Sequence, residues 1–268
     1  LALSARHCSD ATRSFRDGLL TALLPEPASA VQRPDGTLRL RARTEEGLEQ
    51  LRFVLAVDDD HSEFLRRFGR DPLLGTTLSR LAGMRQLRLA TVTHALLRAL
   101  CGQLIESGRA RAIERRIVRA ATPRDPETGL HEPPTRASLG CLSPAAVRAH
   151  GLADRRASAL VRVSWGLDVE RLHSVPTAIA AARIERERAL GPWSAGVICL
   201  EGLGRTERGL VGDLGLVKVL AAQRGRWVEG WETAELLEPY GEWAGLASVY
   251  LLAGFGRGLL PLPARRAA

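Results

Sequence analysis

The segment from Leu190 to Gly204, with the Gly212-Asp213 pair that follows it, constrains the fold more than any other part of the sequence. It reads LGPWSAGVICLEGLG, so Pro192 stands at the first position of an expected helix, directly after Gly191. The first N–H groups of a helix have no partner within the helix, and the helix dipole is positive there, which favours a bound anion such as phosphate. The segment therefore predicts an anion-binding helix start, with the Asp213 carboxylate facing the bound group.

Length and composition indicate a globular protein with a polyanionic partner. The chain has 268 residues, 45% of them hydrophobic, enough for one large domain or two with a sizeable core. The net charge is +8 and the sequence pI is about 10.4, with basic residues spread along the chain. All but one of the 38 basic residues are arginine. GC-rich coding also produces such a bias, so the number of basic residues is not by itself evidence for DNA binding.

The sequence shows neither an apolar run of transmembrane length nor a secretory signal pattern, so we expect a cytoplasmic protein. Four widely separated cysteines lack the spacing of a zinc site and are expected to be reduced thiols: Cys8, Cys101, Cys141 and Cys199.

Hydrophobic periodicity divides the chain into a small α/β lobe over residues 1–60 and a helical domain over residues 61–268. In the first part, strands are expected at 37–43 and 53–57, with a helix at 45–51 between them. Residues 123–134 are rich in proline and charge and predict an exposed loop. The pattern predicts helices at about 61–68, 91–105, 109–121, 144–150, 154–166, 177–188, 192–203, 214–222, 232–237 and 243–252.

The hairpin ERALGPWSA at 187–195 and the aspartate after it resemble the helix-hairpin-helix DNA glycosylase superfamily, and within it the 3-methyladenine DNA glycosylase II family. The resemblance spans roughly residues 71–252. It implies a mainly α fold of two helical lobes with a small α/β N-terminal lobe. It also implies a monomeric base-excision-repair enzyme, acting on duplex DNA in the cytoplasm (nucleoid), that flips a damaged base, expected to be an alkylated purine, and hydrolyses its N-glycosidic bond.

The first half of the hairpin departs from the family pattern. Arg188 and Ala189 stand where the family has proline and its first glycine. A turn that requires a positive φ at Ala189 would carry a strain that glycine avoids, so the grip on DNA is expected to be altered.

Asp213 matches the catalytic aspartate of the family. In the family this carboxylate stabilises the positive charge that develops on the sugar as the base departs, and it helps water to attack. The alternative interpretation is that Asp213 only caps the helix at 214–222, a role that aspartate favours.

Trp193 and Tyr250 are the aromatic candidates for the base pocket. In the relatives, a tryptophan at the position of Trp193 helps to line that pocket; packing in the core is the alternative for both side chains. The best-known member of the family has aromatic residues at the places matching Val197, Leu252 and Ala253, where this chain has aliphatic ones. The identity of the damaged base is therefore open, and a neutral base remains an alternative.

The DNA-binding candidates lie at the hairpin and at the segment Cys-Gly-Gln-Leu-Ile-Glu. Gly191 and the backbone N–H groups of Trp193, Ser194 and Ala195 are expected to position a phosphate. Leu104 matches the family's wedge leucine, which fills the space left by the flipped base, although a core position is the alternative. Gln103 is expected either to touch the orphaned base or to cap its helix, and Arg109 either to reach a phosphate or to lie solvated.

The resemblance implies hydrolysis by water alone. Bifunctional members carry a nucleophilic lysine at the position of Trp193, whereas Lys218, the chain's single lysine, does not match it. No metal is expected, and no iron–sulfur cluster, because no cysteine follows Cys199; a monovalent cation at the hairpin carbonyls, as in relatives, is the one ion the resemblance allows. A different class stays open, a non-catalytic module that uses the hairpin to bind distorted or branched DNA.

Overall fold

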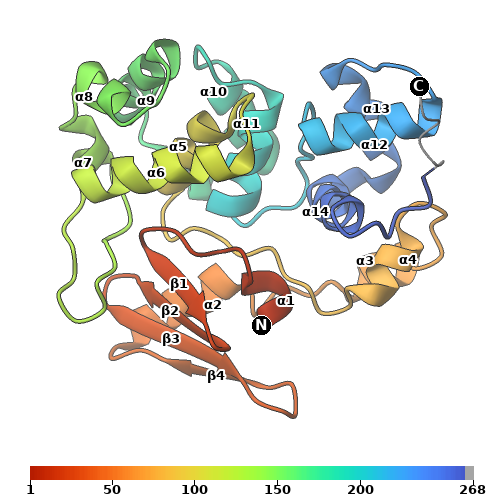
Figure 1. Ribbon diagram of the computed structural model, residues 1–268, viewed down its shortest axis with the longest axis horizontal. Coiled ribbons are helices and arrows are strands. Elements are labelled where there is room, and N and C mark those ends of the chain that lie inside the picture. Colours follow the sequence, from red (N-terminus) through yellow and green to blue (C-terminus); the bar gives the residue numbers. More distant parts are fainter. Residues whose placement is uncertain (263–268) are drawn as a thin grey trace.

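The computed structural model describes residues 1–262; residues 263–268, the end of the predicted helical domain, lie outside the described part. An antiparallel sheet near the N-terminus lies beside a larger group of helices (Figure 1). The strands follow one another in the order β1-β2-β3-β4 and have these bounds: β1 Arg13–Arg16, β2 Leu19–Leu23, β3 Pro27–Gln32 and β4 Leu38–Arg41. This confirms a mainly helical fold with a small N-terminal α/β part.

Helix α2, Glu45–Leu55, covers one face of the sheet. Leu20 and Ala30 pair in the register of β2 and β3, and both are buried against Leu51 and Val54 of α2. Thr44 begins the helix by accepting a hydrogen bond from the N–H of Gly47 at 3.0 Å.

The expected strand at 37–43 is confirmed as β4, and the expected helix at 45–51 extends to Leu55. The strand expected at 53–57 is wrong: this apolar run completes α2, because Leu51, Val54 and Leu55 share the buried face of a helix. Strands β1, β2 and β3 were not predicted. The edge strand β1 reads Arg-Ser-Phe-Arg, and its polar residues give a weak hydrophobic signal.

The remaining helices follow the predicted order closely. Two short helices were not predicted, α1 (Ala2–Ala5) and α4 (Gly75–Arg80), and neither was α7. The others have these bounds: α3 Ser62–Phe68, α5 Val92–Gly102, α6 Ser107–Ala121, α7 Arg136–Gly140, α8 Pro144–Ala149, α9 Asp154–Gly166, α10 Thr177–Glu185, α11 Pro192–Val197, α12 Leu214–Arg224, α13 Thr233–Leu237 and α14 Ala244–Phe255.

Short irregular helices connect several of these elements: η1 Val169–Ser174, η2 Ile198–Gly202, η3 Gly230–Glu232 and η4 Glu238–Trp243. The helix expected at 192–203 is therefore α11 continued by η2, which has π-helical hydrogen bonding. A β-carbon at Gly202 would lie 2.8 Å from the β-carbon of Ala95, so the glycine permits η2 to lie directly against α5.

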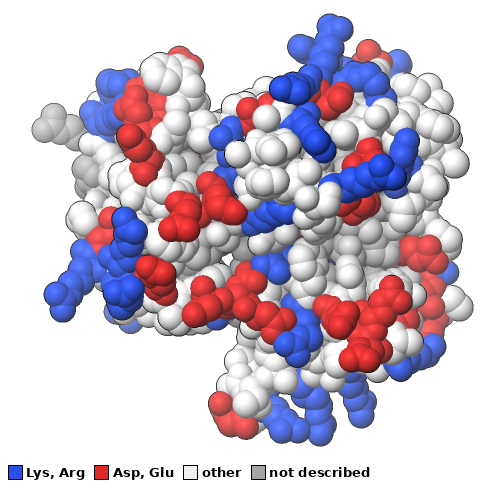
Figure 2. Space-filling model, turned by 180° about the vertical axis from the view of Figure 1, so that it is seen from behind, with Lys and Arg blue, Asp and Glu red and all other residues white. Residues whose placement is uncertain are grey.

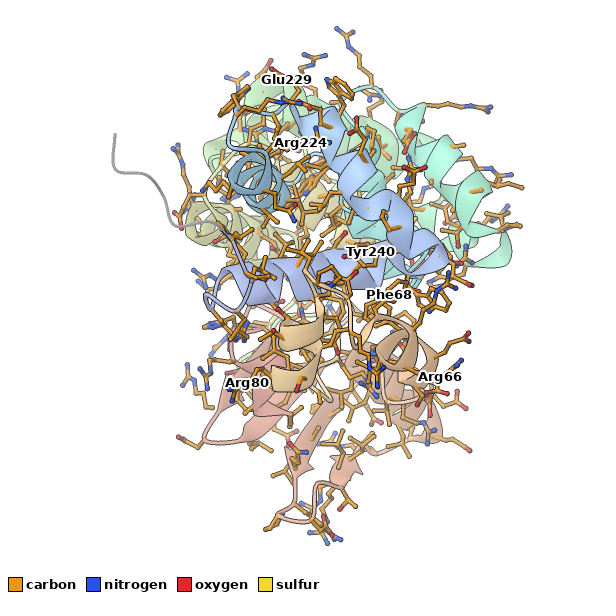
Figure 3. All side chains as sticks on the ribbon, turned by 90° about the vertical axis from the view of Figure 1, so that its right-hand side faces the viewer. Arg66, Phe68, Arg80, Arg224, Glu229 and Tyr240 are labelled. Carbon is orange, nitrogen blue, oxygen red and sulfur yellow. The ribbon has the colours of Figure 1, made fainter. Side chains whose placement is uncertain are left out.

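Two main hydrophobic cores are formed. The smaller one joins the sheet to α2, and the larger one fills the helical part. Ala11 packs in the larger core and Leu87 in the smaller one, so chain segments cross between them. A domain boundary at residue 60 stays a prediction. Within the larger core, Phe68 of α3 packs on Tyr240 of η4 with ring centroids 5.1 Å apart (Figure 3).

Among residues 1–262, no helix combines the length and the apolar character needed to cross a membrane.

Candidate nucleic-acid site

The hairpin turn between α10 and α11 contains the strained residue that the sequence predicts. Ala189 has a φ of +77°, in the left-handed region that favours glycine. Gly191 has a φ of −125°, which any residue adopts, and a β-carbon built there would meet no protein atom within 4 Å. The outer side of the turn at Gly191 is therefore open to an approaching ligand.

The start of α11 offers fewer N–H groups than expected. Within the described residues, the N–H groups of Trp193 and Ser194 have no hydrogen-bond acceptor, whereas Ala195 N–H donates to the carbonyl of Gly191 at 3.0 Å. The expectation that Ala195 contributes its N–H to an anion is therefore wrong, because that N–H closes the first turn of the helix. Two donors remain for a phosphate.

Asp213 both caps a helix and contacts the hairpin helix. Its Oδ1 accepts from the N–H of Gly215 at 2.7 Å, which begins α12. Its Oδ2 accepts from the indole Nε1–H of Trp193 at 3.0 Å. The preceding Gly212 has a φ of +89°, a conformation that L side chains rarely adopt. The carboxylate is half-buried and is oriented by one hydrogen bond on each oxygen.

Trp193 is held between Asp213 and the end of α5. A β-carbon at Gly102 would lie 2.7 Å from Cη2 of Trp193, so only glycine leaves room for the indole there. The glycine before Gln103 thus has a steric role in placing the indole beside Asp213.

The Gln103-Leu104 turn lies beside the hairpin. Gln103 Nε2 donates to the carbonyl of Ala189 at 2.8 Å and to Ser194 Oγ at 2.9 Å. Leu104 projects into solvent with 87% of its surface exposed, and its φ is +55°. The alternative of a core leucine at 104 is therefore wrong. Sequence reasoning missed Arg156 of α9, whose guanidinium donates to the carbonyl of Gln103 at 2.6 Å and supports this turn.

Tyr250 is fully buried and does not reach the site. Its hydroxyl donates to the carbonyl of Met84 at 3.3 Å, and its ring lies 5.7 Å from that of Phe64. The base-pocket role for Tyr250 is therefore wrong, because the α14 face that bears it packs against α3. On the same helix, Leu252 contacts the position of Gly215, so an aliphatic side chain lies close to Asp213.

Arg109 lies exposed on α6, and no ion pair involving it is found within residues 1–262. On the face of the molecule shown in Figure 2, basic and acidic side chains are interspersed. The net charge is therefore not gathered into a single patch on that face.

The hairpin carbonyls do not fit a monovalent cation. Those of Glu187 and Ala189 accept hydrogen bonds from Leu190 N–H and Gln103 Nε2, and that of Arg188 accepts from the Arg162 guanidinium at 2.7 Å. The Arg162 guanidinium already bonded to this turn disfavours a second cation beside it.

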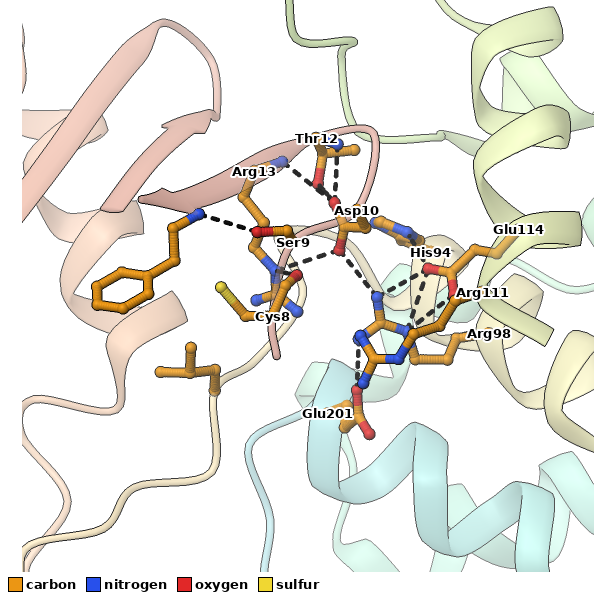
Figure 4. A network of polar contacts seen from close by, with 12 residues as sticks. Cys8, Ser9, Asp10, Thr12, Arg13, His94, Arg98, Arg111, Glu114 and Glu201 are labelled. Atoms are coloured by element: carbon orange, nitrogen blue, oxygen red, sulfur yellow. Dashed lines mark hydrogen bonds and ion pairs between the residues drawn. The ribbon is translucent and has the colours of Figure 1, made fainter. Parts of the chain in front are cut away.

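A buried polar network, which sequence reasoning also missed, joins the N-terminal segment to the helical part (Figure 4). Arg98 of α5 donates to Asp10 at 2.9 Å, to Glu114 at 2.8 Å and to Glu201 at 2.8 Å. His94, four residues before Arg98 on the same helix, lies 2.8 Å from Glu114. The spacing of these two polar residues on an otherwise apolar helix was the signal available in the sequence. Asp10, His94 and Glu114 have the grouping of a metal site, but the guanidinium already occupies the cation position.

Comparison with known proteins gives a clear structural result and no sequence result. Neither a protein-family model nor a curated protein sequence matches the chain. A 3-methyladenine DNA glycosylase from Archaeoglobus fulgidus is similar, with a TM-score of 0.78 and 18% identity over 91% of this chain and 89% of that chain. The 8-oxoguanine glycosylase/lyase of Clostridium acetobutylicum, bound to double-stranded DNA with cytosine opposite 8-oxoguanine, is also similar. Its TM-score is 0.82 and its identity 17%, over 96% of this chain and 91% of that chain.

A third similar structure, DNA-3-methyladenine glycosidase from Bacillus halodurans, gives a TM-score of 0.54 and 20% identity over 74% of this chain and 90% of that chain. The chain has the helix-hairpin-helix DNA glycosylase fold. Glycosylases for alkylated and for oxidised bases both share this fold, so the fold does not choose between those substrates.

Proposed function

We propose that the chain is a monofunctional DNA glycosylase that hydrolyses the N-glycosidic bond of a damaged base, an alkylated purine, in duplex DNA. The observation that carries the proposal is the pair formed by Asp213 and Trp193. It places a half-buried carboxylate against the first turn of the hairpin helix, with one hydrogen bond on each carboxylate oxygen.

The carboxylate suits the chemistry of base release. Breaking the N-glycosidic bond builds positive charge on the sugar, so a fixed anion stabilises the transition state more than the ground state. The hydrogen bonds from Gly215 and Trp193 fix the orientation of Asp213 before the substrate arrives. Water attacks C1′ of the sugar and loses a proton, the bond from C1′ to the base breaks with its electron pair leaving on the base, and an abasic site remains.

The neighbouring elements supply the contacts that extrude a base. The N–H groups of Trp193 and Ser194, beside the open face of Gly191, bind a phosphate and thereby fix the register of the strand. Leu104, held by the Gln103 turn, enters the stack where the base was, which offsets part of the cost of unstacking.

Trp193 supports hydrolysis over lyase chemistry. A lyase needs an amine that attacks C1′ of the sugar, and an indole cannot act as that nucleophile. An indole face next to Asp213 also suits an electron-poor alkylated base, which a π-system attracts. The aliphatic Leu252 beside Gly215 favours a neutral damaged base as the second candidate.

The test compares the wild type, Asp213→Asn and Asp60→Asn on methylated, oxidised and uracil-containing duplexes. Asp60 is a matched control because its Oδ1 accepts from the N–H two residues on, Ser62, at 2.8 Å, as Asp213 does from Gly215. Asparagine keeps a capping oxygen, so both variants should remain folded. Released bases are measured, together with strand breaks before and after mild alkali.

We expect wild type and Asp60→Asn to release methylated purines, with breaks only after alkali, and Asp213→Asn to release none. If the wild type released bases only from the uracil-containing or only from the oxidised duplex, the proposed substrate would be that base and not an alkylated purine. DNA binding without release from any substrate would favour the non-catalytic module for distorted or branched DNA.

A further inference from the structure

Two tryptophans on the loop after α12 are turned to solvent. Trp227 is 75% exposed and Trp231 is 68% exposed, although large aromatic side chains are usually covered. We propose that Trp227 and Trp231 form an aromatic surface at the mouth of the Asp213 site that stacks on an unpaired nucleobase of bound DNA. This inference deepens the proposed function and rests on it for the choice of DNA as the ligand.

The loop that carries the two indoles is anchored by buried contacts. The buried carboxylate of Glu232 accepts from Arg224 at 2.6 Å and from the N–H of Glu229 at 2.7 Å. Val228, between the two tryptophans, is fully buried against Val217 and Leu220 of α12. Figure 3 shows Arg224 and Glu229 close together at the end of the helical part far from the sheet. A flat side chain on a fixed loop loses little entropy when it stacks on a ligand.

The same loop is built directly onto the residues that place Asp213. A β-carbon at Gly230 would lie 3.4 Å from Cα of Gly212, so the two backbones are in close contact. Thr233 Oγ1 accepts from the N–H of Gly212 at 2.8 Å and donates to the carbonyl of Gly230 at 2.6 Å. Trp231 follows Gly230 immediately, and Leu214, which follows Asp213, is 52% exposed. The backbone that bears Trp231 therefore lies beside the backbone that bears the candidate catalytic carboxylate.

The charges around the loop favour a base over a phosphate as the ligand. Arg224 pairs with Glu232 and Glu235, and Arg226 pairs with Glu232, so both guanidinium groups are already neutralised. What remains for a ligand is the aromatic area, and every nucleobase has a π-face that stacks on such a surface. Close to Asp213, the indole of Trp193 is the aromatic group and the aliphatic Leu252 lies against Gly215, so Trp227 and Trp231 would add aromatic area to the site.

The experiment uses a duplex with 2-aminopurine opposite an abasic-site analogue, since the fluorescence of this base falls when it stacks. Binding and quenching are measured for wild type, Trp227→Ala, Trp231→Ala, the double variant and Trp231→Phe. Trp165→Ala is the matched control: Trp165 is 63% exposed on α9, and its indole donates one hydrogen bond, as that of Trp227 does. Thermal unfolding of each protein checks the fold.

We expect each alanine variant to weaken binding by about 5- to 150-fold and to reduce the quenching, because alanine removes the stacked face. Trp231→Phe should retain most of the binding and most of the quenching, and Trp165→Ala should match the wild type in both. Binding and quenching by the double variant equal to those of Trp165→Ala would overturn the inference, and would leave the glycosylase proposal intact if base release still depended on Asp213. Dependence of binding on the two tryptophans, without base release from any duplex, would reject the glycosylase and keep the stacking surface. No DNA binding by the wild type would overturn both.

Discussion

The side-chain amide of Gln103 donates to the hydroxyl of Ser194 at 2.9 Å, and so joins the end of α5 to the first turn of α11. The same amide donates to the carbonyl of Ala189 at 2.8 Å. The exposed Leu104 follows Gln103 directly, so this amide group links the expected wedge to the hairpin. We therefore interpret Gln103 as a positioning residue.

Replacing Gln103 by alanine is expected to lower kcat/KM for base release about tenfold or more while the protein stays folded. The loss leaves Ser194 Oγ and the Ala189 carbonyl without this donor, which costs about 0.5–1.5 kcal/mol of unfolding free energy per hydrogen bond. Gln50→Ala is the control. Gln50 lies on α2, and its Nε2 likewise donates to a backbone carbonyl, that of Ala90, at 2.7 Å. Equal activity of the two variants would argue against a positioning role.

Leu104→Ala should reduce base release from duplex DNA but not from single strands, because a wedge is needed only where bases are stacked. With 87% of the side chain exposed, its truncation should change the unfolding free energy by no more than about 0.5 kcal/mol. Leu19→Ala, a partly exposed leucine on β2, is expected to leave both rates unchanged. A parallel loss on both substrates would instead indicate a general structural effect.

Ala189→Gly should stabilise the protein. A non-glycine residue at a φ of +77° costs about 1–2 kcal/mol of folding free energy, which glycine would relieve. Glycine also raises the conformational entropy of the unfolded chain, and this offsets part of the gain. Ala182→Gly, on the exposed face of α10, should do the opposite and destabilise by about 1 kcal/mol. Urea unfolding measures the change in unfolding free energy for each variant, and we expect the two changes to have opposite signs.

Trp193→Phe tests the hydrogen bond between the indole and Asp213. Phenylalanine keeps an aromatic ring against Gly102 but removes the donor that lies 3.0 Å from Oδ2. We expect kcat to fall about tenfold, with a smaller change in KM, if the bond orients Asp213 for the transition state. A rise in KM at unchanged kcat would show that Trp193 acts only in binding.

Arg98→Met should be strongly destabilising. It leaves the buried carboxylate of Glu114 without its guanidinium partner and Asp10 with Arg13 alone, and breaking a buried ion pair in this way typically costs about 3–5 kcal/mol. Arg148→Met, which breaks the exposed pair with Asp154, should cost no more than about 1 kcal/mol. Chemical denaturation at pH 7 measures the unfolding free energy of both variants.

The same network predicts how stability depends on pH. Burial alone would raise the pKa of Glu114, but the Arg98 guanidinium and the hydrogen bond with His94 outweigh it and lower this pKa to about 2. Because the pKa is lower in the folded than in the unfolded protein, the contribution is complete above the ordinary glutamate pKa of 4.5 and is lost as the pH falls from there towards about 2. In Arg98→Met burial should raise that pKa, so acidification from pH 6 to 4 should narrow the gap in unfolding free energy between variant and wild type. A gap that stays constant would contradict this account.

Much of the site could be predicted from the sequence, because it depends on local backbone chemistry. Pro192 at the first helical position marks the start of α11, and Asp213 before Leu214 is a residue type that caps helices. The missing glycine at Ala189 predicts the strained φ that the structure has. Each of these features involves residues within a few positions of one another, where propensities act directly.

Only the tertiary structure decided which side chains meet. The burial of Tyr250 against Phe64, the indole of Trp193 over Gly102 and the bond from Gln103 to Ser194 each join distant parts of the chain. Periodicity identifies an apolar face but not the element that covers it. It also assigned Phe53–Val57 to a strand, since a short apolar run fits either structure until its packing partners are known. Local sequence thus determined where the helices of the site begin, whereas the packing of remote elements determined which residues surround Asp213.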